Sequence, residues 1–325
     1  MHTVEALLPV WLGMAIALLL DHALGEPPPR WHPVVWMGRY LQYAGAWLQT
    51  RTRPGNAADQ PSFWRGALAW WGGLGLVLIP ASLLQWLLWQ LPWFMAALLA
   101  GLLLKPLLAW RLLAQEVLAV EASLAHSLEA GRQQLARIVS RDVQQLDATQ
   151  VRESALESLA ENLNDSVIAP LCWFCLLGLP GAALYRYADT ADSMWGYRGI
   201  YRGQRWEWAG KWAARADDVL AWLPARITAW ALLLAAGWHS AKQLPAQARQ
   251  TPSPNSGWPM AAMALALSIC LRKPGVYTLN AAGNAPQPMH VAHAIRLGQR
   301  TIWLTVACAA TVTMALATGA WMVQA

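Results

Sequence analysis

The sequence predicts an all-α, polytopic integral membrane protein, and three observations predict it. Of its 325 residues, 56% are hydrophobic and only 13% are charged, and the mean hydropathy is +0.28. Soluble domains carry roughly 25% charged residues. Several apolar runs approach the roughly 20 residues that a helix needs to cross a bilayer. We therefore expect about five to six transmembrane helices joined by helical loops, in a single membrane-embedded domain over residues 1–325.

The apolar runs follow one another along the chain. They cover residues 6–20, two runs within 66–110, then 167–185, 219–238 and 302–323. The first run lies between Glu5 and Asp21 and lacks a basic leader and a cleavage site, so we expect a helix that is retained. The polar stretch 50–62 predicts a loop before the second run.

The run at 167–185 is expected to be a broken or re-entrant segment. It contains four residues that interrupt helices, namely Pro170, Gly178, Pro180 and Gly181. The loops 21–65, 111–152 and 186–215 each hold at least five Lys or Arg, which would place all three on one side of the membrane. Simple alternating spans cannot do this, whereas broken backbone is tolerated where protein buries it.

The net charge of +6 does not indicate a nucleic-acid surface. The Lys and Arg residues are spread through the loops between the apolar runs, where lipid headgroups and membrane topology account for them. No Walker A motif or dinucleotide glycine fingerprint is present, which disfavours a P-loop ATPase.

A helix that begins near Asp147 carries a stripe of carboxylates. Asp147 and Gln150 resemble a capping box, and Glu153, Glu157, Glu161 and Asp165 then recur every four residues. Two interpretations stay open. The stripe is either a solvated face that pairs with arginines, or a site for a divalent cation and phosphate, because Mg²⁺ takes one or two carboxylates plus phosphate oxygens. The arginines that would pair with it are Arg137, Arg141 and Arg152.

Further polar groups flank the later apolar runs. The segment "DTADSMWGY" places Asp189, Asp192 and Ser193 after the broken run, and "ARADDVLAWLPAR" brings the charged residues Arg215, Asp217, Asp218 and Arg226 to the next span. An Arg226–Asp218 ion pair is one alternative for the latter. The polar start of "TPSPNSGWPMAAMALALSICL", residues 251–271, predicts a capped helix or an anion-binding helix start.

Several blocks together resemble the cobalamin-biosynthesis CobD/CbiB family, which includes adenosylcobinamide-phosphate synthase. They are "LLLDHALGEPPPRWHPVVWMGR", "ARIVSRDVQQLD", "ALESLAENLNDSVIAPLCWFCLLGLPGAALYR", "DTADSMWGYR", "AARADDVLAWLPARITA" and "SPNSGWPMAAMALAL", in order from about residue 15 to about residue 280. The resemblance implies a multi-pass enzyme of the cell (inner) membrane. That enzyme would join adenosylcobyric acid, a corrinoid, to aminopropanol or its phosphate with ATP and Mg²⁺.

This chemistry assigns expected roles to the polar residues. Activation of a carboxylate by ATP needs carboxylates to hold Mg²⁺ and arginines to neutralise phosphoryl charge. The catalytic set would be Glu157, Glu161, Asp165, Asp192, Asp217 and Asp218, with Glu161, Asp165 and Asp192 as metal ligands. The substrate-binding set would be His32, Arg141, Asn162, Ser193, Arg215, Arg226, Asn255 and Ser256. Glu153 is expected at the solvent end of the helix, outside the site.

Two departures from the family pattern leave alternatives open. Asp189 and Ala221 stand where the family usually has Asn. A non-catalytic membrane sensor or binding protein on the same scaffold is therefore the second hypothesis. A transporter would show two similar halves with paired interrupted helices, and no such symmetry is evident. Whether the amine arrives phosphorylated, and whether the chain forms a homo-oligomer or joins other enzymes of the pathway, also stays open.

Overall fold

The computed structural model describes residues 2–51 and 59–324, and in these residues the chain is built from helices. Its strands form two small hairpins, β1 (Ile200–Tyr201) with β2 (Gln204–Arg205) and β3 (Leu271–Lys273) with β4 (Tyr277–Leu279). Most of the loop predicted at 50–62 lies outside the described residues.

In the part of the chain that the structure describes, four helical stretches are long and apolar enough to cross a membrane, and a shorter apolar helix runs over Leu8–Leu24. The four stretches are Gln60–Trp89, Trp93–His126, Ala148–Trp195 and Lys211–Ala235. The predicted run 302–323 falls in one long helix, α12 (Pro288–Gln324). The all-α, multi-pass fold is therefore confirmed.

The chain forms two compact units. The first comprises Met1–Leu108, Ala169–Ala221 and Met314–Ala325, and the second comprises Ala109–Ile168 and Trp222–Thr313. Each unit is assembled from separate stretches of the sequence. The expectation of a single domain over the whole chain stays a prediction.

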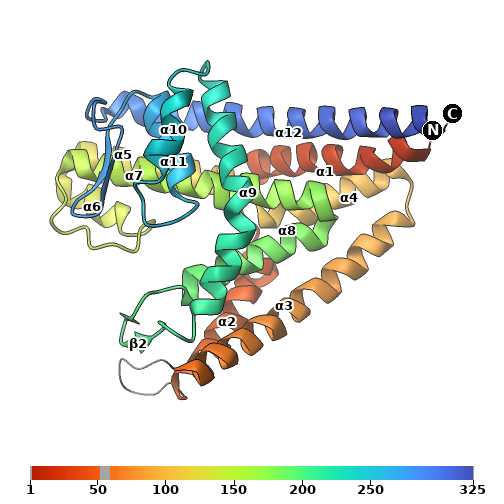
Figure 1. Ribbon diagram of the computed structural model, residues 1–325, viewed down its shortest axis with the longest axis horizontal. Helices are drawn as coiled ribbons and strands as arrows, with labels where there is room; N and C mark the ends of the chain where they lie inside the picture. Colours follow the sequence, from red (N-terminus) through yellow and green to blue (C-terminus); the bar gives the residue numbers. More distant parts are fainter. Residues whose placement is uncertain (1, 52–58, 325) are drawn as a thin grey trace. The chain divides into compact units, whose positions relative to one another are not determined.

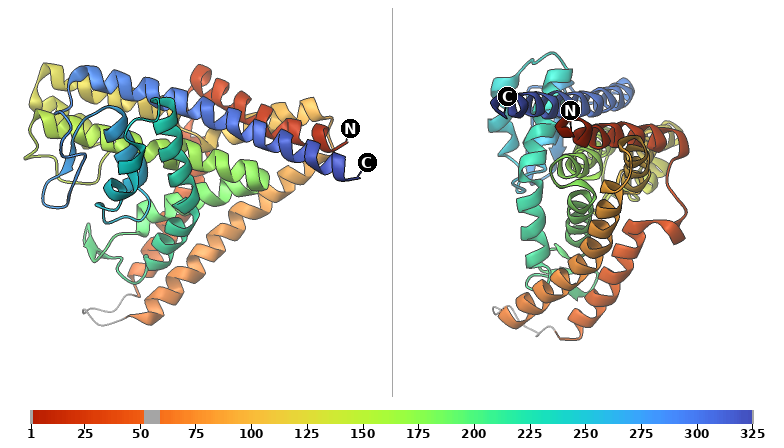
Figure 2. Two further views of the ribbon diagram at one scale, coloured as in Figure 1. Left: turned by 45° about the horizontal axis from the view of Figure 1, so that its top comes forward. Right: turned by 90° about the vertical axis from the view of Figure 1, so that its right-hand side faces the viewer.

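The first unit is built from apolar helices. They are α1 (His2–Leu24), α2 (Pro33–Gln49), α3 (Gln60–Trp89), α4 (Trp93–Leu104), α8 (Ala169–Trp195) and the first part of α9 (Lys211–Ala235), with short 3₁₀ turns at Pro29–Trp31 and Lys105–Leu107. Helices α1 and α4 lie side by side (Figure 2). Gly13 and Gly101 permit this, because a Cβ at Gly13 would meet Ala100 and one at Gly101 would meet Ile16.

Helix α8 doubles back on itself at Gly178, which confirms the predicted break in this segment. Gly178 has φ 68° and ψ −152°, a conformation that glycine alone adopts readily. Ala169 and Tyr185 pack in one core cluster with Ala221. On a straight helix, Ala169 and Tyr185 would be separated by about 24 Å of rise, so only a reversal brings them together. The two arms of α8 can be followed in Figure 1.

In the second unit, other elements surround α7 (Ala148–Leu163). Its neighbours are α5 (Trp110–His126), α6 (Leu128–Leu135), α11 (Gly257–Ala266) and strand β3. The unit also holds α10 (Leu244–Ala248), a 3₁₀ turn at Ala241–Gln243 and the first part of α12. The predicted capping box begins α7, because Asp147 Oδ1 accepts from the Gln150 amide at 2.8 Å and Gln150 Oε1 accepts from the Asp147 amide at 2.9 Å.

Candidate functional site

The predicted site residues fall in both units. The second unit holds Arg141, Glu157, Glu161, Asn162, Asp165, Arg226, Asn255 and Ser256, and the first holds His32, Asp192, Ser193, Arg215, Asp217 and Asp218. Each set is described within its own unit, and the joining of the two sets into one site stays a prediction.

Glu157 on α7 is buried and paired with an arginine. Its Oε2 accepts from Arg141 Nη2 at 2.6 Å, and Arg141 Nη1 also donates to Ser154 Oγ at 3.1 Å. The ion-pairing interpretation of the stripe is thus correct for Arg141. It is wrong for Arg137 and Arg152, which pair with Glu116 at 3.4 Å and with Glu121 at 2.7 Å.

Glu153 does not lie at the solvent end of the helix, and that expectation is wrong. Its side chain is 0% exposed, and its Oε1 accepts from Arg272 Nε at 3.0 Å and from Arg272 Nη2 at 2.9 Å. Its second oxygen, Oε2, is buried and has no hydrogen-bond partner among the described residues. The sequence concealed this pairing because the two residues are far apart along the chain and meet only when the β3–β4 hairpin packs on α7.

The β3–β4 hairpin contributes two residues that the sequence analysis missed, Arg272 and Tyr277. The side-chain hydrogen bond with Glu153 raises the pKa of Arg272. Burial raises the pKa of Tyr277 well above its usual range, and the nearby charge of Glu157 adds to this effect. A Pro-Gly pair at Pro274 and Gly275 marked a turn here, which could have indicated the hairpin.

Towards the end of α7, the stripe becomes accessible. Glu161, Asn162 and Asp165 are half-buried, whereas Glu153 and Glu157 are buried. A π-helical turn at Asn164–Ile168 follows directly, and such turns occur frequently at functional sites. Asn164 Nδ2 donates to Asp165 Oδ1 at 2.7 Å, so the carboxylate of Asp165 has a neighbour that orients it.

These side chains can supply the protein's share of a magnesium–phosphate site. Among the residues that the structure describes, no group of three or more His, Cys, Asp and Glu side chains could hold a metal ion by itself. Mg²⁺ bound to a nucleotide needs only one or two carboxylates, because phosphate and water complete its shell. Glu161 at the end of α7 and Asp165 in the π-helical turn are half-buried, hard oxygen donors, and they fit that requirement.

Arg226 and Asn255 are brought together as predicted residues of one site. Arg226 Nη1 donates to Asn255 Oδ1 at 2.8 Å, and Arg226 Nη2 donates to the Pro254 carbonyl at 3.1 Å. The guanidinium also lies 4.4 Å from the ring centroid of Trp222 and 4.8 Å from that of Trp258. An Arg226–Asp218 ion pair would join the two units, and it stays a prediction.

The loop before α11 organises this arginine's surroundings. Ser253 Oγ accepts from the amides of Asn255 and Ser256, each at 3.2 Å. A cavity of about 590 Å³ is lined by Arg226, Trp258 and this loop. It combines a fixed cation with aromatic rings, so it suits a ligand that has both a flat apolar part and an anionic or carbonyl group.

In the first unit, His32 belongs to a partly buried polar cluster. His32 Nε2 lies 3.0 Å from Glu26 Oε2, and Lys105 Nζ lies 3.2 Å from both Glu26 Oε2 and Asp21 Oδ1. Burial alone would raise the pKa of Glu26, but the His32 hydrogen bond and the Lys105 charge outweigh it and lower that pKa. This cluster joins the end of α1, the start of α2 and the turn after α4.

The other predicted residues of this unit lie at the ends of α8 and α9. Asp192 is half-buried and Ser193 is exposed near the end of α8, while Asp217 and Asp218 are half-buried in the first turns of α9. Arg215 is exposed, and its guanidinium lies 6.0 Å from the ring centroid of Phe63.

The two residues that depart from the family pattern, Asp189 and Ala221, both lie in this unit. Asp189 forms an ion pair with Arg186 at 2.9 Å, one turn earlier on α8. Ala221 is 2% exposed in the core cluster with Ala169 and Tyr185, where a small apolar side chain packs well.

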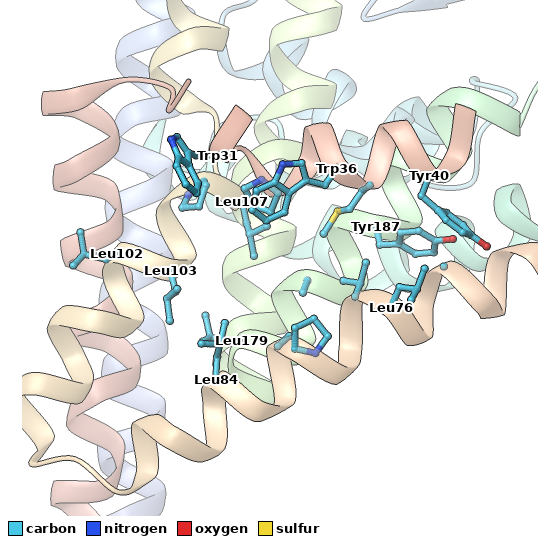
Figure 3. Close-up of a pocket in the computed structure, with 18 residues that line it drawn as sticks. Trp31, Trp36, Tyr40, Leu76, Leu84, Leu102, Leu103, Leu107, Leu179 and Tyr187 are labelled. Atoms are coloured by element: carbon cyan, nitrogen blue, oxygen red, sulfur yellow. The ribbon is translucent and has the colours of Figure 1, made fainter. Parts of the chain in front are cut away.

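An apolar cavity of about 490 Å³ lies within the first unit (Figure 3). Residues of α2, α3, α4 and α8 and of the turns before α2 and after α4 line it, including Trp31 and Trp36. Its tyrosine hydroxyls are engaged elsewhere, since Tyr40 donates to the Ala69 carbonyl at 2.7 Å and Tyr187 to the Trp70 carbonyl at 3.0 Å. None of the predicted site residues lines it, and its walls suit hydrocarbon better than charged substrate groups.

The fold and these polar clusters define a multi-pass helical membrane protein with buried, arginine-paired carboxylates. The sequence model described as "CobD/Cbib protein" matches residues 14–322. The chain therefore belongs to the CobD/CbiB family.

Curated relatives align over nearly the full length. A "Probable cobalamin biosynthesis protein CobD" of Methanothermobacter thermautotrophicus is 37% identical over 309 residues, covering 93% of this chain and 98% of the relative. A "Cobalamin biosynthesis protein CobD" of Chromobacterium violaceum is 39% identical and covers 91% and 94%. One of Stutzerimonas stutzeri is 40% identical and covers 91% and 96%. No solved structure matches the chain. These relatives support a role in cobalamin biosynthesis.

Proposed function

We propose that the protein is the amide-forming ligase of its pathway, an adenosylcobinamide-phosphate synthase. It would use ATP to join a carboxylate of adenosylcobyric acid to the amine of aminopropanol or aminopropanol phosphate. Family membership supports the pathway. The observation that carries the reaction type is the α7 stripe, where an arginine-paired buried carboxylate leads to two half-buried ones.

The role that we propose for each residue follows from its burial. Glu161 and Asp165, with Asp192 as the third predicted ligand, would hold Mg²⁺, which neutralises phosphate charge and orients the nucleotide. Glu157 is held by Arg141, and Tyr277 lies beside it. Together these three side chains fix the position of the accessible carboxylates. Arg141, which the resemblance places among the substrate-binding residues, is a positioning residue in this proposal.

The arginine pocket of the second unit would bind a substrate. Arg226 is preorganised by Asn255 and two tryptophans, so it can meet a carboxylate, a phosphate or an amide carbonyl of the corrinoid with little loss of side-chain entropy. Ser256 and Asn162 would add neutral hydrogen bonds. Arg215, exposed at the start of α9, would contact the ATP phosphates, and Asp217, Asp218, Ser193 and His32 complete the proposed set.

The apolar helices place this chemistry in a lipid membrane, and we propose the cell (inner) membrane. The names of the relatives favour biosynthesis over the sensor hypothesis. Partnership with other enzymes of the pathway, and a homo-oligomeric state, stay predictions.

The test is a reaction of purified protein in detergent with adenosylcobyric acid, ATP, Mg²⁺ and either aminopropanol or its phosphate. Mass spectrometry of the corrinoid should show a mass gain equal to the amine minus water. Asp165→Asn should lower the rate by about a hundredfold or more, because it removes a charge that faces the reacting phosphates. Glu129→Gln, which changes an exposed carboxylate on α6, is the matched control and should retain wild-type activity.

Each outcome is informative. Wild-type activity of Asp165→Asn at saturating Mg²⁺ would remove this residue from the metal site. A wild-type protein that binds neither ATP nor adenosylcobyric acid would favour the sensor hypothesis. Comparison of the two amines would show which one is the substrate.

A further inference from the structure

Two arginines and a histidine line a second cavity in the second unit. This cavity of about 380 Å³ lies among the ends of α9 and α11 and the first part of α12. His293, Arg296 and Arg300 contribute its polar side chains, and no acidic residue lines it. At spacings of three and four residues, these three positions share one face of α12.

The opposite side of α12 is packed against other helices, and this packing fixes the direction of the basic face. Gln299 Oε1 accepts from Trp110 Nε1 at 2.5 Å, which ties α12 to α5. Ala294 and Ile302 are 0% exposed and pack inward. Arg296 and Arg300 are exposed, so α12 presents them at the cavity and cannot turn them into the core.

The two arginines differ from most others in the unit. Arg141, Arg152 and Arg272 each form an ion pair with a glutamate. Within the described part of the chain, Arg296 and Arg300 have no ion pair, hydrogen bond or ring contact, and His293 has a second histidine as its neighbour. The pKa of His290 is lowered by burial and also by His293. Charges of one sign gathered in a concave surface raise the local potential and attract an anion.

The position of these three residues along the chain indicates which kind of anion they bind. Arg300 comes two residues before the predicted membrane run 302–323, and Trp303 follows it with 37% of its surface exposed. Arginine and tryptophan at the end of an apolar helix mark the headgroup region of a bilayer. Basic pockets between helices at this level bind phosphorylated lipid headgroups.

We propose that His293, Arg296 and Arg300 bind the phosphate of an anionic phospholipid headgroup. The site is separate from the proposed ligase residues, so it stands whether or not the ligation is correct. The lipid's phosphate diester would accept hydrogen bonds from the two guanidinium groups, and its acyl chains would lie beside the apolar part of α12.

Native mass spectrometry of the full-length protein, released from detergent after titration with phosphatidylglycerol or phosphatidylcholine, tests the proposal. The wild type should bind the first phosphatidylglycerol molecule about tenfold more tightly than phosphatidylcholine, which corresponds to about 1.4 kcal/mol. The double variant Arg296→Gln with Arg300→Gln should lose this preference. The double variant Arg39→Gln with Lys242→Gln, which removes two exposed positive charges elsewhere, should keep it.

A third titration with inorganic phosphate and ATP separates the two sources of phosphate. Binding of phosphate or ATP at this cluster, without preference for phosphatidylglycerol, would overturn the lipid assignment. Equal lipid preference in the wild type and the Arg296/Arg300 variant would also overturn it. Because both arginines are exposed, the variant should fold, and an unchanged thermal unfolding midpoint checks this.

Discussion

At the scale of single residues, two glutamates one turn apart on α7 have separate partners. Glu157 binds Arg141 from the preceding loop, whereas Glu153 binds Arg272 from the β3–β4 hairpin. Each arginine offsets the cost of burying a carboxylate. The stripe that the sequence displays as four equivalent acids is therefore two structural residues followed by two accessible ones.

Replacing Glu153 by Gln should lower stability, and it should affect catalysis only through the fold. The change removes a charge-assisted hydrogen bond, for which about 1–3 kcal/mol is expected. The lower end is favoured because the Arg272 side chain is 47% exposed. Thermal unfolding in detergent measures the effect, with Glu129→Gln as control. An unchanged midpoint would mean that the Arg272 pair contributes nothing to stability.

Glu26 should make the first unit sensitive to acid. Its pKa is lowered from an ordinary value of 4.5 by His32 and Lys105, against the effect of burial. A depressed carboxyl pKa contributes stability that is fully present above 4.5 and is lost as the pH falls through the lower, folded-state value. The groups that face it are His32, Lys105 and, through Lys105, Asp21.

The measurement is the unfolding midpoint of the wild type and of Glu26→Gln as the pH is lowered through 4.5. The wild type should lose stability more steeply than the variant, which has no carboxyl to protonate at this position. Parallel curves for the two proteins would show that another group carries the acid sensitivity.

The sequence was enough to single out these residues, but it predicted only some of the residues that they contact. It predicted the Asp147–Gln150 capping box because both partners lie within one helical turn. It placed Glu153 in solvent because the partner, Arg272, lies on a hairpin whose position depends on packing against α7 and α11. Local interactions can be predicted from spacing, whereas ion pairs between distant segments require the tertiary fold.

At the scale of elements, the reversal within α8 depends on one glycine and one glutamine. Gln85 Oε1 on α3 accepts the Leu179 amide at 2.9 Å, directly after the turn at Gly178. A Cβ at position 178 would collide with this same side-chain oxygen. The Gly and Pro residues of this segment predicted the interruption. The sequence did not indicate the role of Gln85, because this side chain binds the backbone of a different helix.

Gly178→Ala should therefore destabilise the protein by about 1–3 kcal/mol, since alanine is strained in this backbone region. Gly75→Ala in α3 is the matched control, because a Cβ there meets nothing within 4 Å, and alanine favours a helix by about 1 kcal/mol over glycine. The two variants should shift the unfolding midpoint in opposite directions. A shift of both in the same direction would contradict the strain argument.

At the scale of the whole molecule, composition was enough to predict the class of fold. A chain with 13% charged residues has too little polar surface for a soluble domain of this size, and the helices follow from the lack of water in the bilayer core. The division into two compact units was not predicted, because each unit combines stretches that are distant in sequence.

The membrane topology that the sequence predicts can be tested with thiol labels. Cysteines placed at Gln144 and Gln204, which are both exposed, should react in a cysteine-free background with an impermeant reagent from the same side of the membrane. The basic loops that contain them are expected to share that side. Reaction from opposite sides would contradict the composite site of acidic residues.

The turn at Gly178 also bears on how the protein enters the membrane during synthesis. The residues before the turn, Leu176 and Leu177, are exposed and apolar, and the chain returns immediately afterwards. A helical hairpin with such a tip can partition into lipid from one face as a single body, because no hydrophilic loop has to be carried across. This segment should therefore insert into the membrane even when the translocation machinery cannot export polar sequence.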